Sequence, residues 1–383
     1  MTAVQRPVPL SVLDLVPVSS GSTPAEALRN TVDLAAAAER AGYARYWLAE
    51  HHLNPGVAGS APNIVIGAVA AATSTIRVGS AATLVGNVRA LQVAETFGTL
   101  TGLYGPRFDL GLGRSGAPAP GAPAPPALEP RDDEVVDGLL VPSPFTFRIA
   151  PGSRFALQGE LLGRVPGDVE RFDDELGLIR DLFAGTFQRD GQVVDATPAA
   201  GADVELWIHG STGGASARAA GALGLPYGAN YHTSPGTVLD SVRAYREAFR
   251  PGVLDAPHVI VSADVVAADS AAAASDLALG YDRWVHSIRS GVGAIPYPTP
   301  AWAREHPVDP TVAEAVADRI ATRFVGDAGH VADRLAVLQR VTGADELLVT
   351  TITHDHAARV RSYELLAAEW GARAARPAAV GVA

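Results

Sequence analysis

Short apolar runs alternate along the chain with longer segments in which apolar residues recur at helical spacing. The apolar runs predict eight strands, at residues 8–16, 43–52, 76–82, 108–113, 204–210, 226–229, 258–266 and 346–353. The segments between them predict helices at residues 24–41, 64–73, 92–103, 169–183, 215–223, 235–249, 270–287, 328–341 and 356–370. Strands that alternate with helices pair in parallel through right-handed crossovers. The pattern therefore predicts a (β/α)8 barrel of the α/β class.

Two stretches rich in proline and glycine interrupt this alternation, at residues 115–165 and 290–310. We expect residues 1–383 to form a single barrel domain with insertions after the fourth and the seventh strand. Residues 115–130 form either a flexible linker or a lid, because they leave the C-terminal end of a strand. Residues 131–165 contain scattered apolar positions that indicate a short hairpin.

The composition excludes several classes of function. The formal net charge is −11 and no basic stripe is present, which argues against a nucleic-acid partner. The chain has no cysteine, so disulfides, thiolate catalysis and cysteine-ligated zinc are excluded. Neither a signal peptide nor a run of apolar residues long enough to cross a membrane is present, and we expect a cytoplasmic protein without a membrane partner.

A carboxylate and two imidazoles, Glu50, His51 and His52, end the second predicted strand. In parallel barrels the C-terminal ends of the strands carry the chemistry. The cluster is either a general acid/base or hydrogen-bond donor, or a pair of structural histidines. Because successive side chains on a strand face opposite sides, we expect one of the two imidazoles to point into the barrel.

Three later strand ends also carry candidates for ligand binding. Small residues at 80–82 would let a flat ligand approach the backbone, or would simply pack closely. Arg114 follows a Gly-Leu-Gly sequence and is either a phosphate donor or a surface arginine. Ser211, Thr212 and Ser216 lie where a strand passes into a helix, and they form either an anion site or an ordinary helix cap.

A metal site is a further possibility, because His51, His209, His354 and His356 follow strand ends. Barrel metallohydrolases would also need histidines on the first strand, and residues 8–16 contain none. We therefore expect no metal, and we expect Asp355 to cap the last helix.

Four motifs in this order resemble those of the bacterial luciferase-like flavin-dependent monooxygenases. They are residues 47–52, 78–82, 105–114 and 210–216, and residues 342–347 resemble the family's entry into the last strand. The resemblance extends over the chain apart from residues 115–165 and 290–310. One departure is Gly113, at a position where the family often has a reactive cysteine, so light emission is not implied.

The resemblance implies a (β/α)8 barrel that holds reduced FMN at its C-terminal mouth. His51 corresponds to the family's catalytic histidine, with Glu50 beside it as a cofactor-site candidate. The bond between Ala81 and Ala82 corresponds to a non-prolyl cis peptide under the flavin ring. Arg114 and Ser216 correspond to phosphate contacts, with Ser211 and Thr212 as further candidates, and Tyr231 lies where an aromatic residue flanks the flavin.

The implied activity is insertion of one oxygen atom from O2 into a small organic substrate. Family members commonly take reduced flavin from a separate reductase and form homodimers through early barrel helices. Two alternatives stay open on the same fold. One is hydride transfer with the deazaflavin F420, and the other is flavin binding without catalysis.

Overall fold

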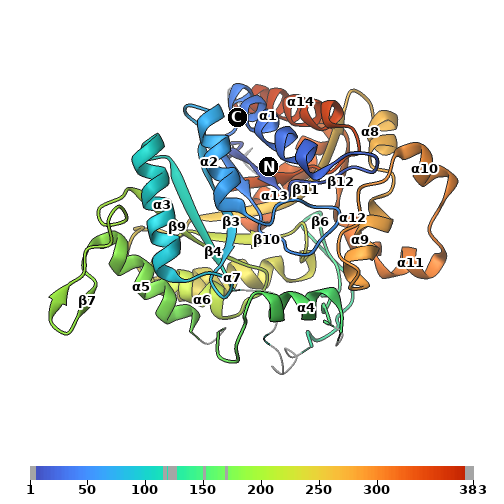
Figure 1. Ribbon diagram of the computed structural model, residues 1–383. Coiled ribbons are helices and arrows are strands. Elements are labelled where there is room, and N and C mark those ends of the chain that lie inside the picture. The colour runs from blue at the N-terminus through green and yellow to red at the C-terminus, as the bar shows by residue number, and fades with distance from the viewer. Residues whose placement is uncertain (1–5, 115–118, 120–126, 150–151, 169–170, 376–383) are drawn as a thin grey trace, which may run out of the picture.

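Eight parallel strands form a closed ring in the computed structural model, which describes residues 6–114, 119, 127–149, 152–168 and 171–375 (Figure 1). The strands are β1 (Leu10–Asp14), β2 (Arg45–Leu48), β3 (Arg77–Leu84), β4 (Phe108–Gly113), β9 (Val204–Gly210), β10 (Tyr227–Asn230), β11 (Val259–Ala268) and β13 (Glu346–Thr350). Each pairs with the next in this order, and β13 pairs with β1 to close the ring. The predicted (β/α)8 barrel is confirmed.

Helices outside the ring follow most of the strands (Figure 1). The principal ones are α1 (Pro24–Ala41), α2 (Pro62–Ala72), α3 (Ala90–Tyr104), α5 (Phe172–Ala184), α6 (Ala215–Ala222), α7 (Val238–Ala248, after the 3-10 turn η1, Pro235–Thr237), α13 (Ala328–Thr342) and α14 (His356–Ala375). Local sequence sets the helix ends. Thr23 and Glu26 form a capping box at the start of α1, and Gly42 ends it at a φ of 86°.

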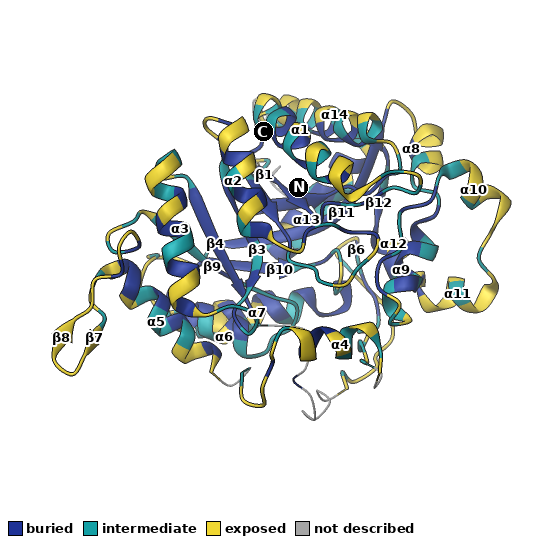
Figure 2. Cartoon of the chain, viewed as in Figure 1, coloured by how far each residue is buried: buried dark blue, intermediate teal, exposed yellow. Residues whose placement is uncertain are grey.

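Side-chain alternation along the strands separates two apolar layers, both buried (Figure 2). On β2, Tyr46 and Leu48 join the layer between strands and helices, whereas Trp47 belongs to the smaller cluster inside the ring. Glycines leave room for the large inner side chains. A Cβ atom at Gly228 would lie 2.1 Å from Nδ1 of His209, so the imidazole fills the space of the missing side chain.

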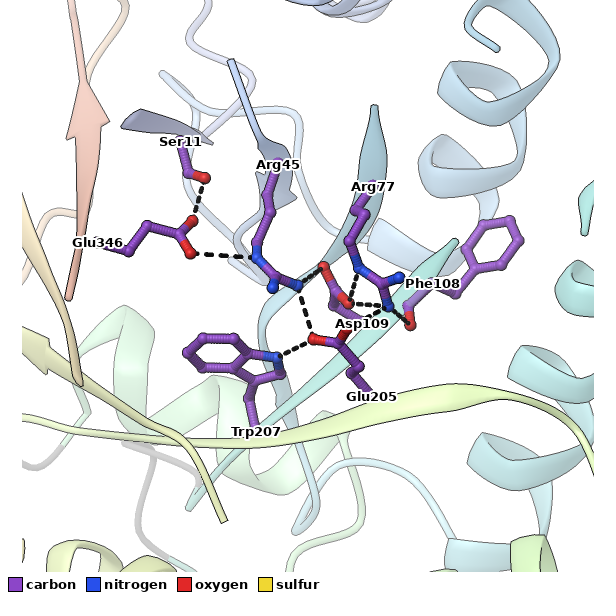
Figure 3. Close-up of polar contacts among 8 residues, drawn as sticks. All are labelled: Ser11, Arg45, Arg77, Phe108, Asp109, Glu205, Trp207 and Glu346. Atoms are coloured by element: carbon purple, nitrogen blue, oxygen red, sulfur yellow. Dashed lines mark hydrogen bonds and ion pairs between the residues drawn. The ribbon is translucent and has the colours of Figure 1, made fainter. Parts of the chain in front are cut away.

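An ion-pair network closes the N-terminal mouth of the ring (Figure 3). Arg45 on β2 contacts Asp109 at 2.7 Å, Glu205 at 2.9 Å and Glu346 at 3.2 Å. Arg77 on β3 contacts the other oxygen of Asp109. Because these residues come from β2, β3, β4, β9 and β13, the network ties together strands that are distant in sequence. Polar groups at this end of a barrel serve stability.

Within residues 258–327 one prediction was wrong and one strand was missed. The helix predicted at 270–287 is broken into α8 (Ala271–Leu277) and α9 (Tyr281–Arg289), because Gly280 adopts a φ of 86° between them. A short strand that the pattern did not predict, β12 (Phe324–Asp327), pairs with the end of β11. The stretch before it contains the short helices α10 (Pro300–Glu305), α11 (Pro310–Ala315) and α12 (Ala317–Thr322).

The segment between β4 and α5 contains the predicted hairpin, β5 (Glu134–Val136) and β6 (Leu139–Val141), followed by helix α4 (Arg154–Leu161). Residues 115–118 and 120–126, to which we assigned a linker or lid, lie outside the described residues. A second small hairpin, β7 (Gln188–Arg189) and β8 (Gln192–Val193), follows α5. None of the helices in the described ranges is long and apolar enough to span a bilayer.

Candidate functional site

Glu50, at the end of β2, fastens the neighbouring strand end rather than facing outward. Its carboxylate accepts hydrogen bonds from the backbone N–H of Leu84 at 2.9 Å and from the amide of Asn87 at 2.7 Å. Nε2 of His52 lies 2.9 Å from the same carboxylate. Glu50, held by His52, therefore keeps the end of β3 in place.

By strand alternation, His51 lies on the same side of the chain as Trp47, whose side chain faces the inside of the ring. Its Nδ1 atom is buried and has no hydrogen-bond partner in the described part of the chain, while its backbone N–H binds the Gly59 carbonyl at 2.9 Å. Burial lowers the pKa of the imidazole to about 4. The ring is therefore neutral at pH 7, and its Nδ1 is left without a protein partner among the described residues.

The end of β3 brings small residues to the same mouth. The peptide bond between Ala81 and Ala82 is cis, as the resemblance implies. The register between β3 and β4 shifts between Ser80 and Thr83, whose hydroxyls lie 2.9 Å apart. Both alanines are half-buried, and Ala81 packs on the inner apolar cluster.

Arg114 and Ser216 meet across two strand ends. Arg114 directly follows β4, and its Nε donates to Oγ of Ser216 in α6 at 3.2 Å. Among the described residues, no carboxylate forms an ion pair with Arg114. Gly210 brings the loop close, because a Cβ there would lie 2.6 Å from the Tyr227 hydroxyl. A guanidinium beside a hydroxyl at a helix N-terminus can hold a phosphate.

Ser211 and Thr212 form the loop between β9 and α6, and both are half-buried. The Ser211 carbonyl accepts a hydrogen bond from the Thr237 hydroxyl of η1. The loop also packs on α7, where a Cβ at Gly213 would lie 3.0 Å from the Asp240 carbonyl. These contacts position the start of α6 beside Arg114.

Tyr231 lies away from the inside of the ring, contrary to our expectation that it flanks a flavin. Its ring is fully buried in the outer layer against Phe324, with the ring centres 5.9 Å apart. Its hydroxyl donates to the Leu140 carbonyl of β6 at 2.8 Å. The residue was misplaced because β10 alternates, and the outward positions include Tyr227, four residues earlier.

His232, the next residue, is the inward side chain that we did not predict. Its Nδ1 lies 2.6 Å from the hydroxyl of Ser262 on β11. Burial lowers its pKa to about 3, helped by the charge of Arg319 and by His51. His232 thus faces the same interior as His51, whose charge acts on it. The alternation of side chains along residues 227–232 could have predicted that His232 faces inward.

Comparison with known proteins decides the family. The sequence model of the luciferase-like monooxygenases matches residues 8–129 and 151–346. The chain belongs to the luciferase-like monooxygenase family. It is 36% identical over 363 residues to the Bacillus subtilis (strain 168) protein YvbT, covering 94% of this chain and 96% of that protein. It is 32% identical to the luciferase-like monooxygenase of Escherichia coli (strain K12), with the same coverage.

The crystal structure of apo-MsnO8 resembles this luciferase-like monooxygenase with a TM-score of 0.75 at 30% identity, over 95% of this chain and 98% of that one. The family match corrects one expectation. We expected the resemblance to omit residues 115–165 and 290–310, whereas the match omits only 130–150 between its two parts. That unmatched segment contains the β5–β6 hairpin, which contacts Tyr231.

His354 and His356, two of the histidines considered for a metal site, have other partners. Nε2 of His354 lies 2.9 Å from the Ser20 carbonyl, and His356 pairs with Asp33 at 2.8 Å. No cluster of histidine and acidic residues able to hold a metal ion occurs in the part of the chain that the structure describes. Asp355 caps α14 by accepting from the Ala358 N–H at 2.7 Å, as predicted.

Proposed function

We propose that this luciferase-like monooxygenase uses reduced FMN and O2 to insert one oxygen atom into a small organic substrate. The observation that supports this most is the contact of Arg114 with Ser216 at the C-terminal mouth of the barrel. Flavin phosphates bind where a cation, a hydroxyl and a helix N-terminus converge. The phosphate of FMN would lie between these two side chains, with Ser211 and Thr212 nearby.

Two distant structures of the same fold use different cofactors, FMN and F420. The oxygenating constituent of 3,6-diketocamphane monooxygenase, in complex with FMN, has a TM-score of 0.66 at 17% identity. An F420-dependent secondary alcohol dehydrogenase has a TM-score of 0.59 at 15% identity. The family assignment favours FMN, and F420-dependent hydride transfer is the alternative.

The chain's own residues would hold the flavin and control protons. Bound flavin supplies the activation of dioxygen. The backbone at Ala81 and Ala82 would lie against the flavin ring, and Glu50 would keep that strand end in position. His51 is neutral at pH 7, so it can donate or accept a proton at its free nitrogen without first losing a charge.

The substrate would approach beside the loop that follows His51. An open cleft of about 470 Å³ lies between Leu53, the start of α4 and residues 291–292. Arg154 of α4 donates to the Leu53 carbonyl at 3.2 Å, which ties this segment to the loop. Residues 152–165 would thus form part of a lid that excludes water from the mouth.

Partners follow from the same proposal. A separate reductase would supply reduced FMN, as the resemblance to the family implies. A homodimer through α2 and α3 is supported by their outer faces, where Ile64 is 77% and Leu103 is 68% exposed.

The cofactor is tested by titrating the protein with FMN and with F420 while following the fluorescence of each. We expect FMN to bind at least tenfold more tightly. Tighter binding of F420 would replace the monooxygenase proposal with the hydride-transfer alternative.

Catalysis is tested with reduced FMN, ¹⁸O2 and candidate substrates. We expect a product containing one labelled oxygen, and a rate at least about 100-fold lower for His51→Ala, the usual loss for a proton-transfer group. His306→Ala is the matched control, because His306 is exposed and lies just after the C-terminal end of α10, outside the candidate site. Unchanged turnover in His51→Ala would remove the catalytic role of the residue.

A further inference from the structure

Arg319, in α12, is a buried guanidinium whose hydrogen-bonding groups are only partly used. The residue is 8% exposed. Its Nη2 donates to the Tyr281 hydroxyl in α9 at 2.7 Å. Its Nε is buried and has no hydrogen-bond partner in the described part of the chain. Buried polar groups of this kind are costly unless a partner completes them.

Other buried arginines in the described ranges are neutralised. Each has a carboxylate partner: Arg164 with Asp168 at 3.3 Å, Arg323 with Asp264 at 2.7 Å and Arg359 with Asp14 at 2.7 Å. No described carboxylate forms an ion pair with Arg319. Since Asp264 is paired with Arg323, the two guanidinium groups of this region share one carboxylate. The two arginines together therefore carry one positive charge more than this carboxylate neutralises.

The location of this charge connects it to the candidate site. Arg319 lies in α12, which packs against η1, the 3-10 turn that follows β10 and His232. Its charge acts on the His232 imidazole, as does His51. The two histidines are neutral at pH 7, because burial lowers the pKa of each far below the usual range. The cluster of His51, His232 and Arg319 thus presents one cation and two neutral imidazoles at the barrel mouth.

We propose that Arg319 binds a carboxylate, or a similarly compact oxyanion, of the substrate beside His51 and His232. This inference rests on the proposed function and names its substrate class as small organic acids. Arg114 and Ser216 follow β4 and β9, whereas Arg319 lies in the segment between β11 and β12. We assign the two cations to different groups, Arg114 to the flavin phosphate and Arg319 to the substrate. Reduced flavin carries an anionic ring edge that could also bind Arg319, and the FMN titrations separate this source from the substrate.

The test compares carboxylates with their neutral amides by calorimetric titration of the protein. The probes are acetate, hexanoate and benzoate, each paired with its amide. We expect at least one carboxylate to bind more tightly than its amide, and Arg319→Met to weaken that carboxylate about tenfold to a hundredfold without affecting the amide. Arg304→Met is the control, since Arg304 is exposed on α10. Equal binding of all three pairs by the unaltered protein would overturn the proposal.

Two further measurements assign the source of the anion and guard against misfolding. Oxidised and reduced FMN should bind Arg319→Met as they bind the unaltered protein. Weaker binding of reduced FMN alone would assign Arg319 to the flavin and overturn the substrate role. Failure of the unaltered protein to bind FMN, with Arg319-dependent carboxylate binding intact, would instead refute the proposed function.

Should Arg319→Met not fold, Arg319→Lys should still weaken carboxylate binding several-fold, because lysine lacks the planar fork of arginine. Unchanged carboxylate binding by Arg319→Lys would count against the proposal.

Discussion

Arg359 and Arg361 lie two residues apart on α14 in opposite surroundings. Arg359 contacts Asp14 at 2.7 Å with both side chains buried, whereas Arg361 pairs with Asp269 at 2.9 Å where both are exposed. Arg359→Met leaves Asp14 buried without its cation, and we expect a loss of about 3–5 kcal/mol in the free energy of unfolding. Arg361→Met should change it by less than about 1 kcal/mol. Urea denaturation at pH 7 measures both, and similar values for the two variants would contradict the account.

Single residues also show how far the sequence could predict the site. Strand alternation predicted that one of the two adjacent imidazoles faces inward, and His51 has the free nitrogen while His52 contacts Glu50. The same alternation, applied to residues 227–232, would have selected His232 instead of Tyr231. The sequence could not predict that Arg319 is buried, because its partner Tyr281 is distant in sequence.

Helix α3 offers a prediction at the scale of an element. A Cβ at Gly98 would lie 2.6 Å from backbone atoms of Pro198 and Ala199, whereas a Cβ at Gly102 would meet nothing within 4 Å. Gly98→Ala should therefore destabilise the protein by at least about 1 kcal/mol, by forcing the helix from its neighbour. Gly102→Ala should stabilise it by about 0.5–1 kcal/mol, because alanine favours a helix interior. Thermal denaturation of the two variants gives the signs, and a gain in stability for Gly98→Ala would contradict the packing.

Elements were predicted well where the periodic pattern was long and capped. The capping box and Gly42 fix α1 within the sequence itself, and its bounds agree with the prediction. β12 was missed because it has only 4 residues and is stabilised by the end of β11, a long-range contact. The break at Gly280 was missed because an isolated glycine inside a helical pattern is often tolerated.

The whole molecule should lose stability in mild acid. Burial lowers the pKa of His51 and of His209 to about 4 and that of His232 to about 3, from 6.5. Each imidazole gains a proton on unfolding below pH 6.5, so its contribution to stability is present above that pH and is lost as the pH falls through 4. The slope is about 1.4 kcal/mol per pH unit for each fully titrating histidine.

Asp109 acts in the opposite direction. Burial raises the pKa of its carboxyl to about 6, against the pull of Arg45 and Arg77, so its contribution is present below pH 3.8 and is lost as the pH rises towards 6. One carboxyl opposes three imidazoles, and we expect the free energy of unfolding to fall between pH 6.5 and 5. Urea denaturation across this range measures the change. We expect His209→Asn to reduce the slope of the free energy of unfolding against pH. A free energy that is constant or rises in acid would contradict it.

The central claim is that the mouth of this barrel holds a flavin by its phosphate, between Arg114 and Ser216. The most direct measurement is the affinity for FMN against that for riboflavin, which lacks the phosphate, in the unaltered protein and in Arg114→Met. We predict that the unaltered protein binds FMN at least about tenfold more tightly, the gain from a charge-assisted hydrogen bond, and that Arg114→Met abolishes the difference. Equal affinity of the unaltered protein for the two flavins would contradict the account.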